Sequence, residues 1–236
     1  MKKYLLFLSI ACLALLSACG PARPELAASC QPDHQQSSYF AGLVGGQCVA
    51  VSLEAPLTTG YAVYGRRDQP RPDAYETTIG YNWSSRDYRF NALQVNFLYP
   101  DPEADGETRP EEYWELVPGR QAWGHIDSPR PPDAPMVRAP VKGVIVRQWA
   151  SNVPSSSTGT FRSNTGPQGP ENYVEITKVE QHATSPDHLW ITGRLSVDLY
   201  NFMGQPMQKI HNAEFRGSML KPKLLAERSV WPPKVR

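Results

Sequence analysis

The sequence predicts a mainly β protein, an antiparallel sandwich or barrel of about eight to ten short strands with one short helix near residues 109–117. Two observations lead to this class. Apolar residues recur at every second position in several segments, which is the pattern of strands with one buried face. The chain also has 23 prolines, which divide it into short segments and disfavour long helices.

Strands are expected in both halves of the chain. In the first half, alternation or a short apolar run marks residues 47–53, 61–64, 75–83 and 88–97. In the second half, a Val/Ile-rich strand at 142–149 is followed by a Ser/Thr/Gly/Pro-rich loop at 152–171 and three strands at 173–181, 188–200 and 207–219. The strand at 188–200 has the most regular alternation, with an apolar face formed by Leu189, Ile191, Leu195, Val197 and Leu199.

The short helix is expected to begin after Thr108. Thr108 and Glu111 form a capping box, Pro110 suits the first turn, and the acidic Glu111 favours the positive end of the helix dipole. About two turns should follow before Pro118 ends them. A Pro-rich stretch at residues 128–140 then acts either as a linker between two halves of the domain or as a long surface loop.

The first 18 residues have the three regions of an export signal. Lys2 and Lys3 give a cationic start, residues 4–16 are an apolar run, and small residues follow at the expected cleavage point. An uncleaved membrane anchor is the alternative. A span needs roughly 20 apolar residues, whereas Gly20 and Pro21 end this run early, so we expect cleavage.

Leu16, Ser17, Ala18 and Cys19 follow the apolar run directly. They resemble the lipobox of bacterial lipoprotein precursors, in which a Leu and two small residues precede an invariant Cys. The resemblance implies cleavage before Cys19, diacylglycerol attachment to its thiol and acylation of its amine, for example with palmitate. Two or three acyl chains hold a protein stably on a bilayer.

The same resemblance indicates the membrane. In Gram-negative lipoproteins an Asp after the lipidated Cys commonly retains the protein at the inner membrane, and Gly20 stands here instead. We therefore expect an outer-membrane lipoprotein on the periplasmic side, or one on the outer face of the cell membrane if the source has a single membrane. Residues 19–38 should be a lipidated tether, and residues 39–236 the β-rich domain.

Removing the signal leaves two cysteines besides the lipidated one. Cys30 and Cys48 would lie in a compartment that permits disulfides, and each can pair only with the other. We favour this disulfide. Two free buried cysteines, or a metal site completed by His34, are the alternatives, although this spacing is a poor zinc signature.

Charge and motifs exclude several function classes. The formal charge of +1 becomes −1 once Lys2 and Lys3 are removed, which leaves no basic field for nucleic acid. The motifs of α/β-hydrolases, HExxH zinc enzymes, phosphate loops and CxxC redox proteins are absent. The sequence therefore predicts no catalytic residues, no cofactor and no metal.

Four weaker patterns have an ordinary structural explanation beside a functional one. Gly42 to Gly46 predicts a tight turn, and His182 with His188 and Asp187 fits exposed turn residues better than a metal site. Tyr75, Tyr81 and Trp83 share a strand face, which predicts core packing ahead of a sugar-binding platform. The fourth pattern is a set of charges expected on the outer face of the last strands, which is a solvated face or a partner-binding face: Arg194, Asp198, Glu214 and Arg216.

The last strands also resemble known proteins weakly. Residues 191–195 and 213–217 loosely resemble C-terminal meanders of uncharacterised bacterial lipoproteins with β-sandwich domains, which implies a fold class and no activity.

Three function classes remain. We favour a membrane-anchored, non-enzymatic lipoprotein that binds an envelope or secreted protein, because catalytic motifs are absent and the anchor would confine the domain near such a partner. The alternatives are a lipid- or glycan-binding carrier, which needs a cavity, and a periplasmic hydrolase with a site built from scattered residues.

Overall fold

The structure is a computed structural model, and it describes residues 30–53, 58–65, 72–83, 90–101, 110–126, 139–151 and 159–228. Within these ranges the protein is mainly antiparallel β, which confirms the predicted class. The described chain contains eleven strands, slightly more than expected: β1 (Ser38–Val44), β2 (Gln47–Leu53), β3 (Thr58–Tyr64), β4 (Ala74–Trp83), β5 (Phe90–Pro100), β6 (Gly119–Arg120), β7 (Gly143–Ser151), β8 (Thr160–Arg162), β9 (Tyr173–Gln181), β10 (His188–Tyr200) and β11 (Pro206–Leu220).

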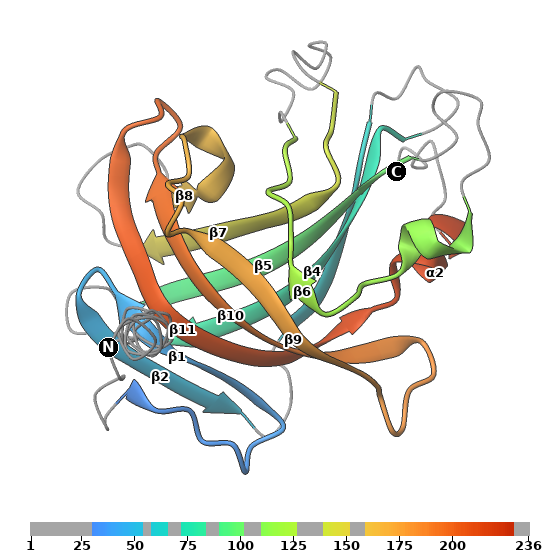
Figure 1. Cartoon of the computed structure of the whole chain (residues 1–236), viewed down its shortest axis with the longest axis horizontal. Coiled ribbons are helices and arrows are strands. Elements are labelled where there is room, and N and C mark those ends of the chain that lie inside the picture. Colours follow the sequence, from blue (N-terminus) through green and yellow to red (C-terminus); the bar gives the residue numbers. More distant parts are fainter. Residues whose placement is uncertain are drawn as a thin grey trace, which may run out of the picture.

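All these strands belong to one open sheet. Its order is β2-β1-β11-β10-β8-β7-β5-β4-β3, so β2 and β3 are its edges (Figure 1). Residues 128–140, where a division between two halves was considered, lie mostly outside the described residues. Strands from either side of this stretch pair directly, β5 with β7 and β1 with β11, so the sheet is continuous across it.

The long strand β10 changes partner along its length. Its first part, from Leu189 to Ser196, pairs with β9, whereas Tyr200 pairs with Arg162 of β8. The space between β9 and β7 is bridged by residues 119–126, which bond to β9 and then to β7. The sheet therefore curls around its core with few breaks in backbone pairing.

One core fills the inside of the curled sheet. Buried side chains from β1, β4, β5 and β7 to β11 form a single cluster. Figure 1 shows β10 and β11 as long curved strands that cross the direction of β4 and β5. At the crossing, a Cβ on Gly217 would lie 2.2 Å from Ile79 Cγ2, so a larger residue there would force β11 away from β4.

The predicted two-turn helix at residues 109–117 is wrong in extent. The chain forms only the 3-10 turn η2 (Glu111–Trp114), and Pro110 precedes it without a side-chain cap. Thr108 of the predicted capping box lies outside the described residues. Tyr113 donates a hydrogen bond to the Pro100 carbonyl at 2.8 Å, and Trp114 stacks on the buried Tyr99. Aromatic packing, more than helical propensity, therefore fixes this segment.

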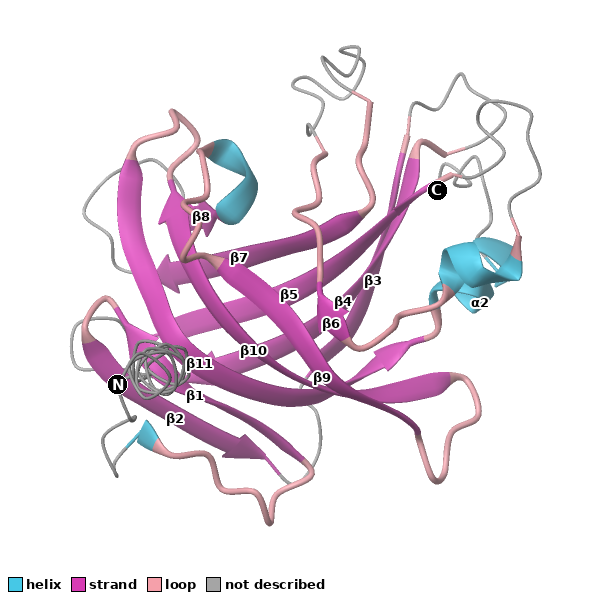
Figure 2. Cartoon of the chain, in the orientation of Figure 1, coloured by secondary structure: helices cyan, strands magenta, loops and turns pink. Residues whose placement is uncertain are grey.

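Two further short helices were not predicted. The turn η3 (Ser163–Thr165) follows β8, and helix α2 (Pro222–Arg228) follows β11 and buries Leu225 (Figure 2). η3 has three residues and α2 has seven, so neither gives enough periodic signal for a prediction from sequence.

A buried ion pair joins β4 to β7 across β5. Every residue of β4 from Ala74 to Tyr81 is buried, so both faces of this strand are covered. On the outer face, Arg147 of β7 forms a two-point pair with Glu76 at 2.5 and 2.7 Å, and it also donates to the Tyr64 hydroxyl of β3 at 3.2 Å. Burial alone would lower the pKa of Arg147, but Glu76 outweighs this effect and raises it.

We predict that Glu76→Gln lowers the free energy of unfolding by about 3–5 kcal/mol, because it leaves the buried guanidinium without a counter-charge. Urea denaturation followed by circular dichroism measures this change. The double change Glu76→Leu with Arg147→Met should recover most of the loss. Glu111→Gln is the control, since it breaks an exposed pair with Lys223, and it should leave the midpoint nearly unchanged. Equal effects of Glu76→Gln and Glu111→Gln would contradict the assignment.

Candidate ligand pocket at the open end of the sheet

A disulfide joins Cys30 to Cys48, with the two Cα atoms 5.3 Å apart. Cys30 is fully buried. The bond ties the chain that precedes β1 to the start of β2, on the side of β2 opposite the pocket described next. The alternatives of free cysteines and of a metal site with His34 do not apply in this structure, where the His34 ring contacts Tyr39.

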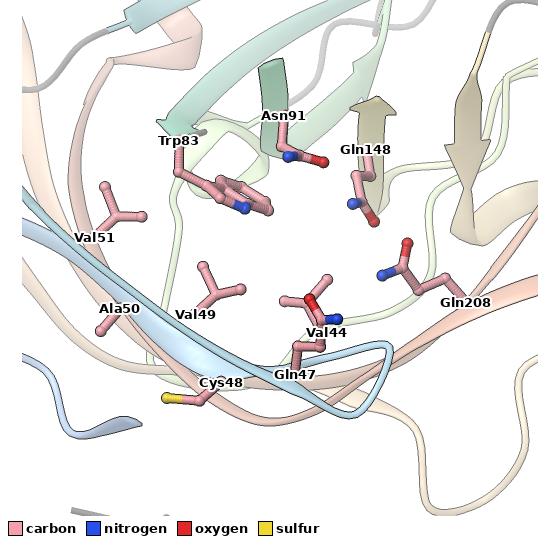
Figure 3. A pocket seen from close by; sticks show the side chains of 10 residues that line it. All are labelled: Val44, Gln47, Cys48, Val49, Ala50, Val51, Trp83, Asn91, Gln148 and Gln208. Atoms are coloured by element: carbon pink, nitrogen blue, oxygen red, sulfur yellow. The ribbon is translucent and has the colours of Figure 1, made fainter. Parts of the chain in front are cut away.

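A pocket with a volume of about 320 Å³ lies at one end of the curled sheet, between β1, β2 and β11 on one side and β4, β5 and β7 on the other. We call this end the open end. Within the described part of the chain ten residues line the pocket, and none of these ten carries a charge: Val44, Gln47, Cys48, Val49, Ala50, Val51, Trp83, Asn91, Gln148 and Gln208. In Figure 3, Gln47, Val49 and Val51 point into the space from β2, whereas the Cys48 sulfur points away from it.

Trp83, the last residue of β4, provides the apolar wall. Its ring lies parallel to that of Phe40, with centroids 6.3 Å apart, and Phe40 packs in turn on Tyr81. Phe40 and Tyr81 are fully buried and Trp83 is half-buried. The aromatic core thus ends at Trp83, whose indole extends into the pocket (Figure 3).

Four carboxamides form the polar part of the lining. Asn91 and Gln148 are 2% and 1% exposed. Gln148 Oε1 is buried, and no hydrogen-bond donor reaches it in the described part of the chain. Such a buried acceptor costs about 1–3 kcal/mol unless a partner is supplied, and Figure 3 shows the Gln148 side chain directed into the pocket.

The turn between β1 and β2 shapes one rim of the pocket. Gly45 and Gly46 have φ values of 58° and 80°, which confirms the predicted tight turn. The Gly45 amide donates to the Lys209 carbonyl of β11 at 2.9 Å. A Cβ on Gly45 would lie 2.7 Å from Gln208 Nε2, so the absence of a side chain at Gly45 leaves the space in which Gln208 lies.

Aromatic side chains cover the opposite end of the sheet. Tyr113 and Trp114 of η2 pack against Tyr99, and Lys142 Nζ lies 5.1 and 4.6 Å from the centroids of Tyr99 and Tyr113. Burial lowers the pKa of Lys142. Burial also raises the pKa of Tyr81, below the open end, well above its usual value, so this phenol remains neutral beneath the pocket.

The predicted partner face is formed in part. Arg194 lies opposite Glu214 in the β10–β11 ladder, and Arg216 pairs with Glu180 of β9 at 2.8 Å. Asp198 belongs to a separate cluster further along β10, where it accepts a hydrogen bond from Asn172 at 2.8 Å and lies 3.6 Å from Lys209.

The histidine hairpin does not assemble a metal site. His182 stacks on Trp190 with centroids 4.9 Å apart, and His188 Nδ1 lies 2.7 Å from the Ser185 hydroxyl. Asp187 pairs instead with Arg228 of α2 at 2.9 Å. Among the described residues, no group of three or more His, Cys, Asp or Glu side chains is arranged to hold a metal ion.

The aromatic set on β4 divides between core and pocket. Tyr75 and Tyr81 are buried, as predicted for core residues, and only Trp83 reaches the pocket. The predicted lipid attachment residue, Cys19, lies outside the described residues together with the rest of the signal.

Sequence reasoning missed the pocket carboxamides, although a signal was present. Gln148 follows Val144 and Val146 at a period of two, and Asn91 precedes Leu93 in the same way. A carboxamide that occupies an inward-facing position of an otherwise apolar series indicates a polar site beside the core.

Comparisons with protein-family models, with curated proteins and with solved structures return no match. No helix in the described ranges is both long enough and apolar enough to cross a bilayer.

Proposed function

We propose that this protein is a binding protein held at a membrane surface through Cys19, and that its pocket at the open end takes a small, uncharged ligand. The proposal combines the lipobox at residues 16–19 with the geometry of the pocket. We favour a small ligand over the protein partner expected from the sequence, because the pocket brings an indole, aliphatic side chains and carboxamides together in one space.

The observation that supports the ligand most directly is the buried Gln148 Oε1. A buried acceptor without a partner destabilises the folded protein, and buried polar groups of this kind are rare in native structures. Buried acceptors without a partner also occur at Asn164 and Asn172 among the described residues, but of these three only Gln148 lines the pocket. We infer that its carboxamide serves a ligand there. A ligand hydroxyl or amide that enters the pocket would supply the missing donor.

The disulfide supports a link between anchor and pocket. Cys48 lies on β2, which forms one wall of the pocket, and its partner Cys30 is the first residue of the described chain. A tether that ends at Cys30 is thereby attached directly behind the ligand site.

The ligand proposal predicts a mass adduct that depends on Gln148. The full chain, solubilised in detergent, is incubated with a dialysable small-molecule extract of the producing cells and examined by native mass spectrometry. Gln148→Met should lower adduct occupancy about tenfold or more, because one buried hydrogen bond is lost. It should not lower the thermal midpoint, since it removes an unpaired acceptor.

Gln35→Met is the matched control, because Gln35 is exposed and remote from the pocket lining. It should retain the adduct. Absence of any adduct from the unaltered protein, or equal occupancy in Gln148→Met, would refute the ligand proposal.

The anchor proposal predicts lipidation at Cys19. Cells fed an alkyne fatty acid should label the unaltered protein, and Cys19→Ser should abolish the label and move the protein from the membrane to the soluble fraction. Cys12→Ser is the control, because Cys12 lies in the predicted signal, and it should label normally. Equal labelling of Cys19→Ser and the unaltered protein would exclude this anchor.

A protein partner on the outer face of β9 to β11 is the second candidate function. The observation in its favour is Trp190, which is half-buried between the His182 ring and the Arg216 guanidinium at 5.3 Å. Tryptophan and arginine are the side chains most enriched at binding hot spots. Arg194, which is exposed on the same face, extends this surface.

This second candidate predicts a crosslink at a defined position. A photo-crosslinking residue at Arg194 should recover one envelope or secreted protein, and Trp190→Ala should reduce its yield severalfold. The same crosslinker at Tyr61, which is 67% exposed on edge strand β3, should recover nothing specific. Identical crosslinked species from both positions would remove support for this face.

A further inference from the structure

The pocket restricts the charge of its ligand. Among its ten lining residues there is no Asp, Glu, Lys, Arg or His. A charged group that entered would lose hydration without gaining a counter-charge, which is strongly unfavourable. The part of the ligand that contacts these ten residues is therefore expected to be uncharged.

The carboxamides require a ligand with many hydrogen-bonding groups. Each Asn or Gln side chain offers both a donor and an acceptor, and a hydroxyl group has the same dual capacity. Gln148 Oε1 needs a donor, and Asn91, Gln47 and Gln208 approach the same space from other strands (Figure 3). A ligand with several adjacent hydroxyls matches this arrangement.

The apolar wall of the pocket, formed by Trp83 and Val49, favours a ligand that also has an apolar face. The Trp83 indole is held by Phe40 behind it, and Val49 faces the same space from β2 (Figure 3). A pyranose ring has an apolar face of C–H groups and a rim of hydroxyls, so it can stack on an indole while its rim hydrogen-bonds. The volume of about 320 Å³ is at the small end of the range for ligand sites, which suits one or two sugar rings.

We propose that the pocket binds an uncharged pyranose unit of a glycan, stacked on Trp83 and hydrogen-bonded to Gln148 and Asn91. This inference rests on the proposed function, because it names the chemical class of the ligand for the same pocket. An extended peptide fits less well. Its backbone could bond to carboxamides, but a pocket of this size beside an indole favours a ring with one apolar face over an extended chain.

The test uses defined probes and the full chain in detergent. Ligand-observed saturation-transfer NMR is recorded with glucose, cellobiose, maltose and N,N′-diacetylchitobiose as neutral sugars, with glucuronate as a charged ring, and with N-acetyl-trialanine amide as a neutral peptide. At least one neutral sugar should bind, and glucuronate should bind at least about tenfold more weakly than glucose, because its carboxylate has no partner in the pocket.

Two pairs of variants locate the binding. Trp83→Leu and Gln148→Met should each weaken sugar binding about tenfold or more. Trp149→Leu and Gln35→Met should leave it unchanged, because alternation along β7 turns Trp149 to the outside and Gln35 is exposed. If Trp83→Leu does not fold, Gln148→Met alone decides the outcome.

The failures of the two proposals can be told apart. A Gln148-dependent adduct from the cell extract, together with no binding of any neutral sugar or with binding of the peptide alone, overturns the glycan and keeps the pocket. Sugar binding that is equal in Gln148→Met and the unaltered protein also overturns the glycan assignment. If the extract gives no adduct, the ligand proposal itself fails.

Discussion

The buried pair between Glu76 and Arg147 fixes how β7 lies in the sheet. Side chains alternate along a strand, so an Arg147 that points outward to Glu76 requires its neighbour Gln148 to point inward. The pair spans β5, and Tyr64 extends it to β3. A shift of one residue would bury Gln148 on the outer face and direct the guanidinium into an apolar core. The position of the pocket's most buried carboxamide therefore depends on an ion pair on the opposite side of the sheet.

The same alternation divides the inside of the sheet into core and pocket. On β5 and β7 the inward positions are apolar up to Asn91 and Gln148, and beyond Gln148 the inward Ala150 belongs to the core again. On β4 the inward aromatic residues continue to Trp83. These strands therefore contribute most of their inward residues to the core and one residue near an end to the pocket lining.

The strands were predictable because their sequence signal is local. The assembly of the site was not predictable, because its residues are far apart in the sequence. Alternation gave the bounds of β9 and β10 correctly, since one buried face leaves a period of two in the sequence. The helix near residues 109–117 was overestimated, because a capping pattern says nothing of tertiary packing. Glu76 and Arg147 lie 71 positions apart, and no local pattern connects them. The carboxamides of the pocket come from four separate strands, so only the fold brings them together.

The disulfide would connect the proposed membrane anchor to the pocket, because it bonds Cys30 to Cys48 of β2. If Cys19 is lipidated as proposed, Cys30 lies eleven positions after the anchor, and a fully extended chain of that length spans at most about 40 Å. Without the bond to Cys48, the free tether would continue to the start of β1 and would not be attached to the pocket wall. With it, the open end stays within a few nanometres of the bilayer. A glycan that is itself attached to or layered on a membrane lies within that distance, and confinement raises its effective concentration at the pocket. Weak binding by a small, uncharged pocket would then be sufficient, which is consistent with a site that has one indole and a few carboxamides.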